Sequence, residues 1–142
     1  MSLLGTGLLV VADAALGIWL GSIVFFSFIG APTTFDVLDD DAGQVVNAIF
    51  PKYYAFGLGL GFVAFGAAII GNATGAFDGL LTAVLAIVGV VLSGYARWVL
   101  IPKMEAAGDD AFAQYHKQSI VLNGVTMLAV AGGIVAIVAG TV

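Results

Sequence analysis

The sequence predicts an all-α integral membrane protein, a bundle of four transmembrane helices, for three reasons. Apolar residues make up 61% of the chain and charged residues only 9%, whereas soluble domains carry about 25% charged residues. Four apolar segments, at 7–30, 45–70, 80–101 and 117–139, match the roughly 20 residues that a helix needs to cross a bilayer. All the basic residues of the chain lie at the same ends of these segments: Lys52, Arg97, Lys103 and Lys117.

The one-sided basic residues also predict the orientation of the protein. Lysine and arginine concentrate in short cytoplasmic loops, so the first and third connections are expected in the cytoplasm and both termini outside the plasma membrane. A chain of 142 residues leaves room for a single transmembrane domain, residues 1–142, surrounded by membrane lipid.

The first span carries Asp13, Gly17 and Gly21 at four-residue steps, which places them on one helix face. The two glycines would let a second helix approach closely, within the bundle or from another protomer. Asp13 has two interpretations: a functional carboxylate inside the membrane, or a hydrated residue at the outer interface. The second is favoured, because the apolar run from Asp13 to Gly30 already holds about 18 residues and nearly spans a bilayer.

Prolines divide the next segments. Pro32 is expected to end the first span and Pro102 the third, because the residue before a proline disfavours the helical conformation. After the first acidic connection, a short interfacial helix is expected over residues 42–50, with a kink at Pro51. Gly57 and Gly61 then repeat the small-residue step and predict close helix packing in the second span.

The third span carries a stripe of small and polar residues that ends in a cation. Its members are Thr82, Ala86, Gly89, Ser93 and Arg97. Gly89 and Ser93 are expected to pack inside the bundle. Arg97 needs a partner at the inner interface, for which Glu105 and Asp36 are the nearest candidates in the sequence; the alternative is a side chain that reaches the lipid headgroups.

The fourth span has the clearest polar face. His116, Ser119, Asn123 and Thr126 recur at helical spacing. Lipid offers these groups no hydrogen-bond partner, so the stripe must face protein or a water-filled cavity. Asp13, Arg97 and this stripe are the candidate residues of an intramembrane pathway.

The two halves of the chain share one plan, which is span, proline, acidic connection, short helix, lysine and span. Pro32 and Lys52 mark the first half, and Pro102 and Lys117 the second. Both halves would enter from outside, so the two helical hairpins would be related by an axis along the membrane normal. The alternative is that two hairpins obey the same membrane rules without being a repeat.

Composition excludes several classes of site. The chain has no cysteine and one histidine, so thiol catalysis and thiolate metal sites are excluded, and no metal or haem cofactor is expected. It also lacks a nucleophile and base pair or a metal triad, so an enzyme is not expected.

The acidic residues predict the kind of organism from which the chain comes and exclude one class of partner. The formal charge is −5, and most acidic residues fall in the predicted cytoplasmic loops: Asp36, Asp39, Asp40, Asp41, Glu105, Asp109 and Asp110. Acidic, lysine-poor loops are typical of salt adaptation, which favours a halophilic archaeon over an ordinary bacterium with one acidic loop. Without basic patches, nucleic acid is not expected as a partner.

Three segments carry a resemblance to a known family. They are residues 17–28 with the following Ala31-Pro32-Thr33-x-Phe35, residues 48–54, and Phe112 with His116 and Ser119. Together they resemble the transmembrane-protein-205-like family, a four-span domain of unknown function, over nearly the whole chain. The resemblance implies a membrane protein of unassigned biochemistry; the third span and the acidic loops are less similar.

Two functions remain open from the sequence. The first is a non-enzymatic membrane protein that works as a homo-oligomer or as an accessory subunit of a larger complex, which the small-residue faces support. The second is a small transporter or channel for an ion or small solute. Replacement of Asp13 or Asn123 by alanine would separate them, since loss of a flux in an intact assembly favours transport and loss of assembly favours packing.

Overall fold

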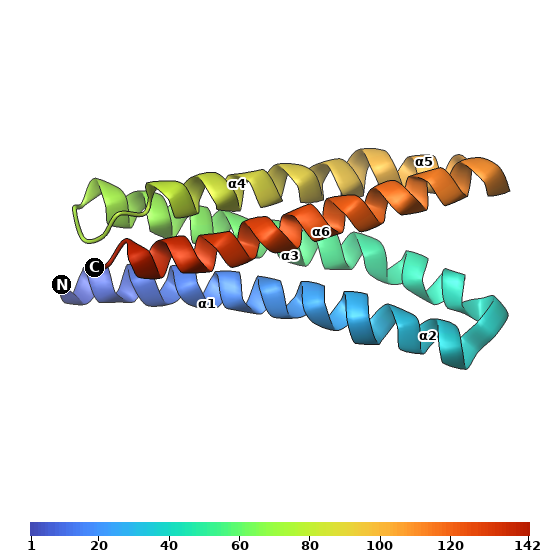
Figure 1. The fold of residues 1–142 in the computed structure, drawn as a ribbon, viewed down its shortest axis with the longest axis horizontal. Coiled ribbons are helices and arrows are strands. Elements are labelled where there is room, and N and C mark those ends of the chain that lie inside the picture. The colour runs from blue at the N-terminus through green and yellow to red at the C-terminus, as the bar shows by residue number, and fades with distance from the viewer.

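The computed structural model folds the apolar sequence into helices over nearly its whole length (Figure 1). It describes the backbone of residues 1–142 and every side chain except those of Asp109 and Asp110. The prediction that acidic residues gather in the cytoplasmic loops includes these two, and they lie outside the described side chains. No strand occurs in the described backbone, and the all-α prediction is confirmed for it.

The first half of the chain is a long helical hairpin. Helix α1 (Leu3–Phe25) continues through a π-helical turn, η1 (Phe26–Gly30), into α2 (Ala31–Leu38). The 3-10 turn η2 (Asp39–Asp41) reverses the chain, with Asp39 at a positive φ of 44°. Helix α3 (Ala42–Ala73) then returns along α1.

The second half has the same order of elements. Helix α4 (Leu80–Tyr95) passes through a second π-helical turn, η3 (Ala96–Leu100), into α5 (Ile101–Ala106), and α6 (Asp109–Ala139) returns. Both termini lie at one end of the molecule, and α2 and α5 lie at the other (Figure 1). We call the latter the α2/α5 end. Every basic residue belongs to a segment at this end, since each lies near the start of α3 or α6 or within η3 or α5.

The expectation that Pro32 and Pro102 end their helices is wrong. Each proline follows a π-helical turn, in which the N–H of Ala31 reaches the carbonyl of Phe26 and the N–H of Ile101 that of Ala96. Each proline then occupies the first turn of the next helix, where its missing N–H is tolerated. The wider turn lets the helix continue past the proline ring.

Helix α3 also continues through its proline. Residues 42–50 form the first turns of α3 and not a separate helix, and Pro51 lies inside an unbroken helix. The interfacial place of these turns and the kink at Pro51 stay predictions. Val46 and Tyr54 are buried on either side of Pro51. Burial of these apolar side chains offsets the lost backbone hydrogen bond.

Three continuous helical stretches are long and apolar enough to cross a membrane: Leu3–Ala73, Leu80–Ala106 and Ala111–Ala139. The first of them folds back at η2, so that α1 and α3 lie side by side (Figure 1). Helix α1 packs against α3 and α6, and α4 packs against the same two helices from the other side. The lengths and composition of these helices indicate a membrane protein.

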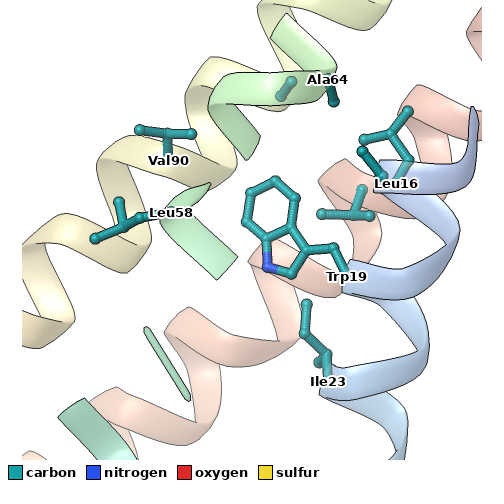
Figure 2. Packing of buried hydrophobic residues seen from close by; sticks show 9 residues of the cluster. Leu16, Trp19, Ile23, Leu58, Ala64 and Val90 are labelled. Carbon is teal, nitrogen blue, oxygen red and sulfur yellow. The ribbon is translucent and has the colours of Figure 1, made fainter. Parts of the chain in front are cut away.

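Trp19 of α1 fills the centre of the molecule and is 2% exposed. Figure 2 shows its indole reaching from α1, between Leu16 and Ile23, toward Leu58 and Val90. Glycines make room for the ring: a Cβ at Gly57 would lie 2.6 Å from the indole Nε1, and a Cβ at Gly89 would lie 2.6 Å from its Cη2. Gly61 meets the same ring.

The glycines of the first span differ from these. A Cβ at Gly17 or Gly21 would meet no atom within 4 Å, and both residues are exposed together with Asp13. This face of α1 therefore points away from the other helices of the chain. A contact with a second protomer at this face stays a prediction.

Candidate functional site

A groove of about 440 Å³ lies at the α2/α5 end and has three walls, which are α6, the arm formed by η1 and α2, and α3. Figure 1 shows α6 diverging from α2 toward this end. The arm contributes Phe26, Ser27, Phe28, Ala31, Pro32 and Phe35. Helix α3 contributes Phe50, Tyr53 and Tyr54, and α6 contributes His116, Ser119, Ile120, Asn123, Gly124 and Met127.

The groove is open because η1 and α2 bury none of their residues. The corresponding elements of the second half are packed: η3 buries Ala96 and Leu100, and α5 buries Ile101 and Met104. The equivalent crevice there, between α3, α5 and the start of α6, holds only about 20 Å³. The open groove beside the η1–α2 arm thus has only a small counterpart beside α5.

Aromatic rings from η1 and α3 build one wall of the groove. Phe26 lies 5.6 Å from Phe50 and 4.8 Å from Tyr53, measured between ring centroids. Tyr54 lies 5.0 Å from Tyr53 and 6.1 Å from Phe50. Rings at these separations stabilise one another, so the wall is formed without a ligand.

A chain of two hydrogen bonds crosses the groove and joins its three walls. The Tyr53 hydroxyl donates to Oδ1 of Asn123 over 2.7 Å, and Nδ2 of Asn123 donates to Oγ of Ser27 over 2.7 Å. Asn123 therefore satisfies the requirement that a polar group in an apolar surrounding finds protein partners.

The other members of the fourth-span stripe make local contacts. Ser119 and Thr126 are buried, and their hydroxyls donate to carbonyls of their own helix, those of His116 and Leu122. His116 is exposed at the mouth of the groove, where its ring stacks on Phe112 at 5.9 Å. Of the predicted stripe, Asn123 is the residue that bonds to other helices.

Arg97 has a different partner from those predicted. Its Nε donates to the carbonyl of Pro51 over 3.1 Å, and its guanidinium lies 5.3 Å from the centroid of the Trp98 ring. The prediction of Glu105 or Asp36 as its hydrogen-bond partner is replaced by this backbone contact. Arg97 thus ties η3 to α3 beside the proline of that helix.

The remaining candidate residues lie apart from the groove. Gly89 and Ser93 are buried in the interior of the molecule, and Thr82 of the same stripe donates to the carbonyl of Gly133 over 3.1 Å. Asp13 is exposed on α1 and is no part of the groove lining. The candidate pathway residues therefore do not form one continuous path through the bundle.

Sequence reasoning missed Tyr53 as a site residue and did not single out Ser27, Phe26 or Phe50. The family resemblance could have indicated the groove, because all three segments that carry it contribute to the lining. These contributions are Ser27 and Phe28 from the first segment, Tyr53 from the second, and His116 and Ser119 from the third.

The lining of the groove suits the binding of an apolar molecule. Its described lining is apolar and aromatic, with neutral hydrogen-bonding groups at one place. Among the described side chains, no group of three or more histidine and carboxylate residues lies close enough together to hold a metal ion. An apolar pocket with a few polar groups is the usual form of a small-molecule site.

The comparisons with known proteins agree with a protein of unassigned biochemistry. A family model described as a domain of unknown function, DUF4149, matches residues 14–113. An uncharacterized protein of Aquifex aeolicus (strain VF5) is 33% identical over 131 residues, which cover 89% of this chain and 94% of that protein. No solved structure matches. The more specific transmembrane-protein-205-like assignment stays a prediction. On the extent of the model match and of the similarity to this relative, the chain belongs to the DUF4149 family, whose function is unknown.

Proposed function

We propose that the chain crosses the plasma membrane four times, through α1, α3, α4 and α6, with both termini outside. The closed ring of contacts among these helices supports this number. The basic residues at the α2/α5 end support the orientation, because lysine and arginine concentrate on the cytoplasmic side. The described acidic residues of this end are exposed, as salt adaptation in a halophilic archaeon requires.

Within this frame the protein acts without chemistry of its own, as a binding subunit that takes a membrane-dissolved apolar molecule into the groove. The observation that carries this proposal is the pre-formed aromatic groove of about 440 Å³, a volume typical of small-molecule sites.

The groove is entered from the side. Phe28 and Ile120, on opposite walls, are 65% and 60% exposed. With the helices in a bilayer these side chains face lipid, and an apolar opening at that depth is filled from the hydrocarbon, not from water. A membrane-dissolved ligand therefore reaches the groove without leaving the bilayer.

Transport through the middle of the bundle has less support. Trp19 fills the centre of the bundle, and Asn123 is hydrogen-bonded to Tyr53 and Ser27 and not directed into a central path. The outward face of α1, with Gly17 and Gly21, remains available for assembly into an oligomer or a larger complex. Binding in the groove and assembly through α1 use different surfaces.

Photolabelling with a hexadecane that carries a diazirine tests the proposal, using the full-length protein in phosphatidylcholine liposomes. Mass spectrometry of the labelled peptides is expected to locate the label on the groove segments of α3 and α6. Gly124→Phe should abolish this labelling, because Gly124 lines the groove and a side chain there has open space to enter it.

Gly59→Phe is the matched control. Gly59 is an exposed helix glycine with no atom within 4 Å of an added Cβ, and it lies outside the groove. Its labelling should equal that of the unmodified protein. Label spread evenly over the lipid-facing residues, with no loss in Gly124→Phe, would overturn the proposal.

A further inference from the structure

The hydrogen bonds at the polar end of the groove run in one direction. Tyr53 gives its only hydroxyl proton to Asn123, and Asn123 gives one of its two amide protons to Ser27. Ser27 then keeps its own proton. Its hydroxyl donates to no group in the described part of the chain, unlike those of Ser22 and Thr34 nearby, which donate to helix carbonyls.

Two donors are therefore free at one point of the groove: the Ser27 O–H and the second N–H of Asn123. Both belong to residues of the lining, one on η1 and one on α6. A donor without a partner in an apolar surrounding is stabilised by any acceptor that reaches it. A carbonyl oxygen has two lone pairs and accepts from both donors at once.

The lining also decides the charge of that acceptor. Its described part contains no lysine, arginine, aspartate or glutamate, and its one histidine, His116, is exposed at the mouth, about two helical turns from Asn123. An ionised carboxylate or phosphate at the two donors would therefore have no countercharge beside it, and burying an unpaired charge is costly. The acceptor that fits is uncharged.

We propose that the groove selects long-chain lipids that carry an uncharged carbonyl oxygen, such as an ester, and that Ser27 and Asn123 determine this specificity. The inference rests on the proposed function, since it names the class of molecule that the groove takes from the bilayer. The hydrocarbon chain lies along the aromatic wall of Phe26, Phe50 and Tyr53, and the carbonyl meets the two donors.

Competition against the photoreactive hexadecane tests the selectivity. The liposomes are made of diether phosphatidylcholine, which contains no carbonyl, and the competitors are methyl hexadecanoate and hexadecane. The ester is expected to displace the label at a lower concentration than the alkane. Ser27→Ala should reduce this advantage about 2- to 10-fold, the range of one neutral hydrogen bond.

Ser22→Ala is the control. Ser22 lies on the same helical rod, its hydroxyl donates to the carbonyl of Trp19 over 2.7 Å, and it is not part of the groove. In Ser22→Ala, the ratio of the concentrations at which alkane and ester displace the label should equal the ratio for the unmodified protein. Each competitor partitions into the same membrane with every variant, so partition cancels when the variants are compared. The comparison of the two competitors on the unmodified protein keeps the test valid if Ser27→Ala does not fold.

The outcomes separate the two proposals. Equal competition by ester and alkane, with labelling of the groove intact, would overturn the carbonyl selectivity and leave the proposed function standing. Absence of groove labelling before any competitor is added would overturn the proposed function itself. In diester phosphatidylcholine, weaker labelling supports the bilayer lipid's own ester as the occupant, and equal labelling supports a free lipid.

Discussion

The packing of Trp19 against glycines predicts opposite effects for two substitutions in the same helix. Gly57 and Gly59 both lie in α3, two positions apart. In Gly57→Ala the new methyl group would lie 2.6 Å from the indole Nε1, whereas ordinary contacts are 3.4–4 Å. In Gly59→Ala the methyl group would meet no atom within 4 Å.

The structure sets the expected magnitudes. Trp19 has little room to retreat, because Gly61 and Gly89 meet its ring at other points, so relief requires a shift of about 1 Å between α1 and α3. Overpacking of this kind costs about 1–3 kcal/mol, while alanine in place of a helix glycine contributes about 0.5–1 kcal/mol. Gly57→Ala should lose roughly 1–2 kcal/mol of unfolding free energy, and Gly59→Ala should gain about 0.5–1 kcal/mol.

Unfolding of each purified variant in detergent, followed by far-ultraviolet circular dichroism, measures the difference. The two variants carry the same chemical change, so helix propensity and detergent binding cancel in the comparison. Equal stability of Gly57→Ala and Gly59→Ala would refute the close contact between Trp19 and α3. Gly61→Ala should behave like Gly57→Ala for the same reason.

Two further predictions concern topology and assembly. The chain contains no cysteine, so an introduced one reports its own side of the membrane: Asn72→Cys should react with an impermeant maleimide from outside, and Glu105→Cys only after permeabilisation, with the reverse pattern contradicting the proposed orientation. Gly21→Leu should lower the oligomer mass measured by light scattering without changing the midpoint of thermal unfolding of the protomer, because Gly21 is exposed and a Cβ there would meet no atom within 4 Å. An unchanged mass would exclude this face of α1 as the contact.

The helical, apolar nature of the fold was predictable because it depends on local composition and on segment length. The continuation of helices through Pro32 and Pro102 was not, since a proline commonly ends or bends a helix, and here the preceding turn widens to accommodate it. That widening is seen in the N–H of Ala31 reaching Phe26 and that of Ile101 reaching Ala96. Nothing in the local sequence distinguishes such a turn from a helix end.

The candidate site was predictable in part. The requirement for polar partners identified Asn123, because an amide in an apolar helix must find hydrogen bonds. Its partners could not be named, since Tyr53 and Ser27 lie 70 and 96 residues away along the chain. The groove itself depends on how far the η1–α2 arm stands from α6, which is a property of tertiary packing.

The two halves share elements at a constant spacing and yet differ where it matters for binding. The turns η1 and η3 begin at Phe26 and Ala96, seventy residues apart, as Pro32 and Pro102 are. The same spacing relates Trp19 to Gly89, which the Trp19 ring contacts.

The centre of the bundle has room for a single indole. The first half therefore contributes the ring of Trp19, and the second half has glycine at the equivalent position, Gly89. The ends of the halves also differ, because η3 and α5 bury Ala96, Leu100, Ile101 and Met104 whereas η1 and α2 bury no residue. Two identical hairpins in a symmetric dimer would have to place the same residue at both equivalent positions. Two halves in one chain are free of that constraint, so one arm can bury residues at its end of the molecule while the other lines an open groove.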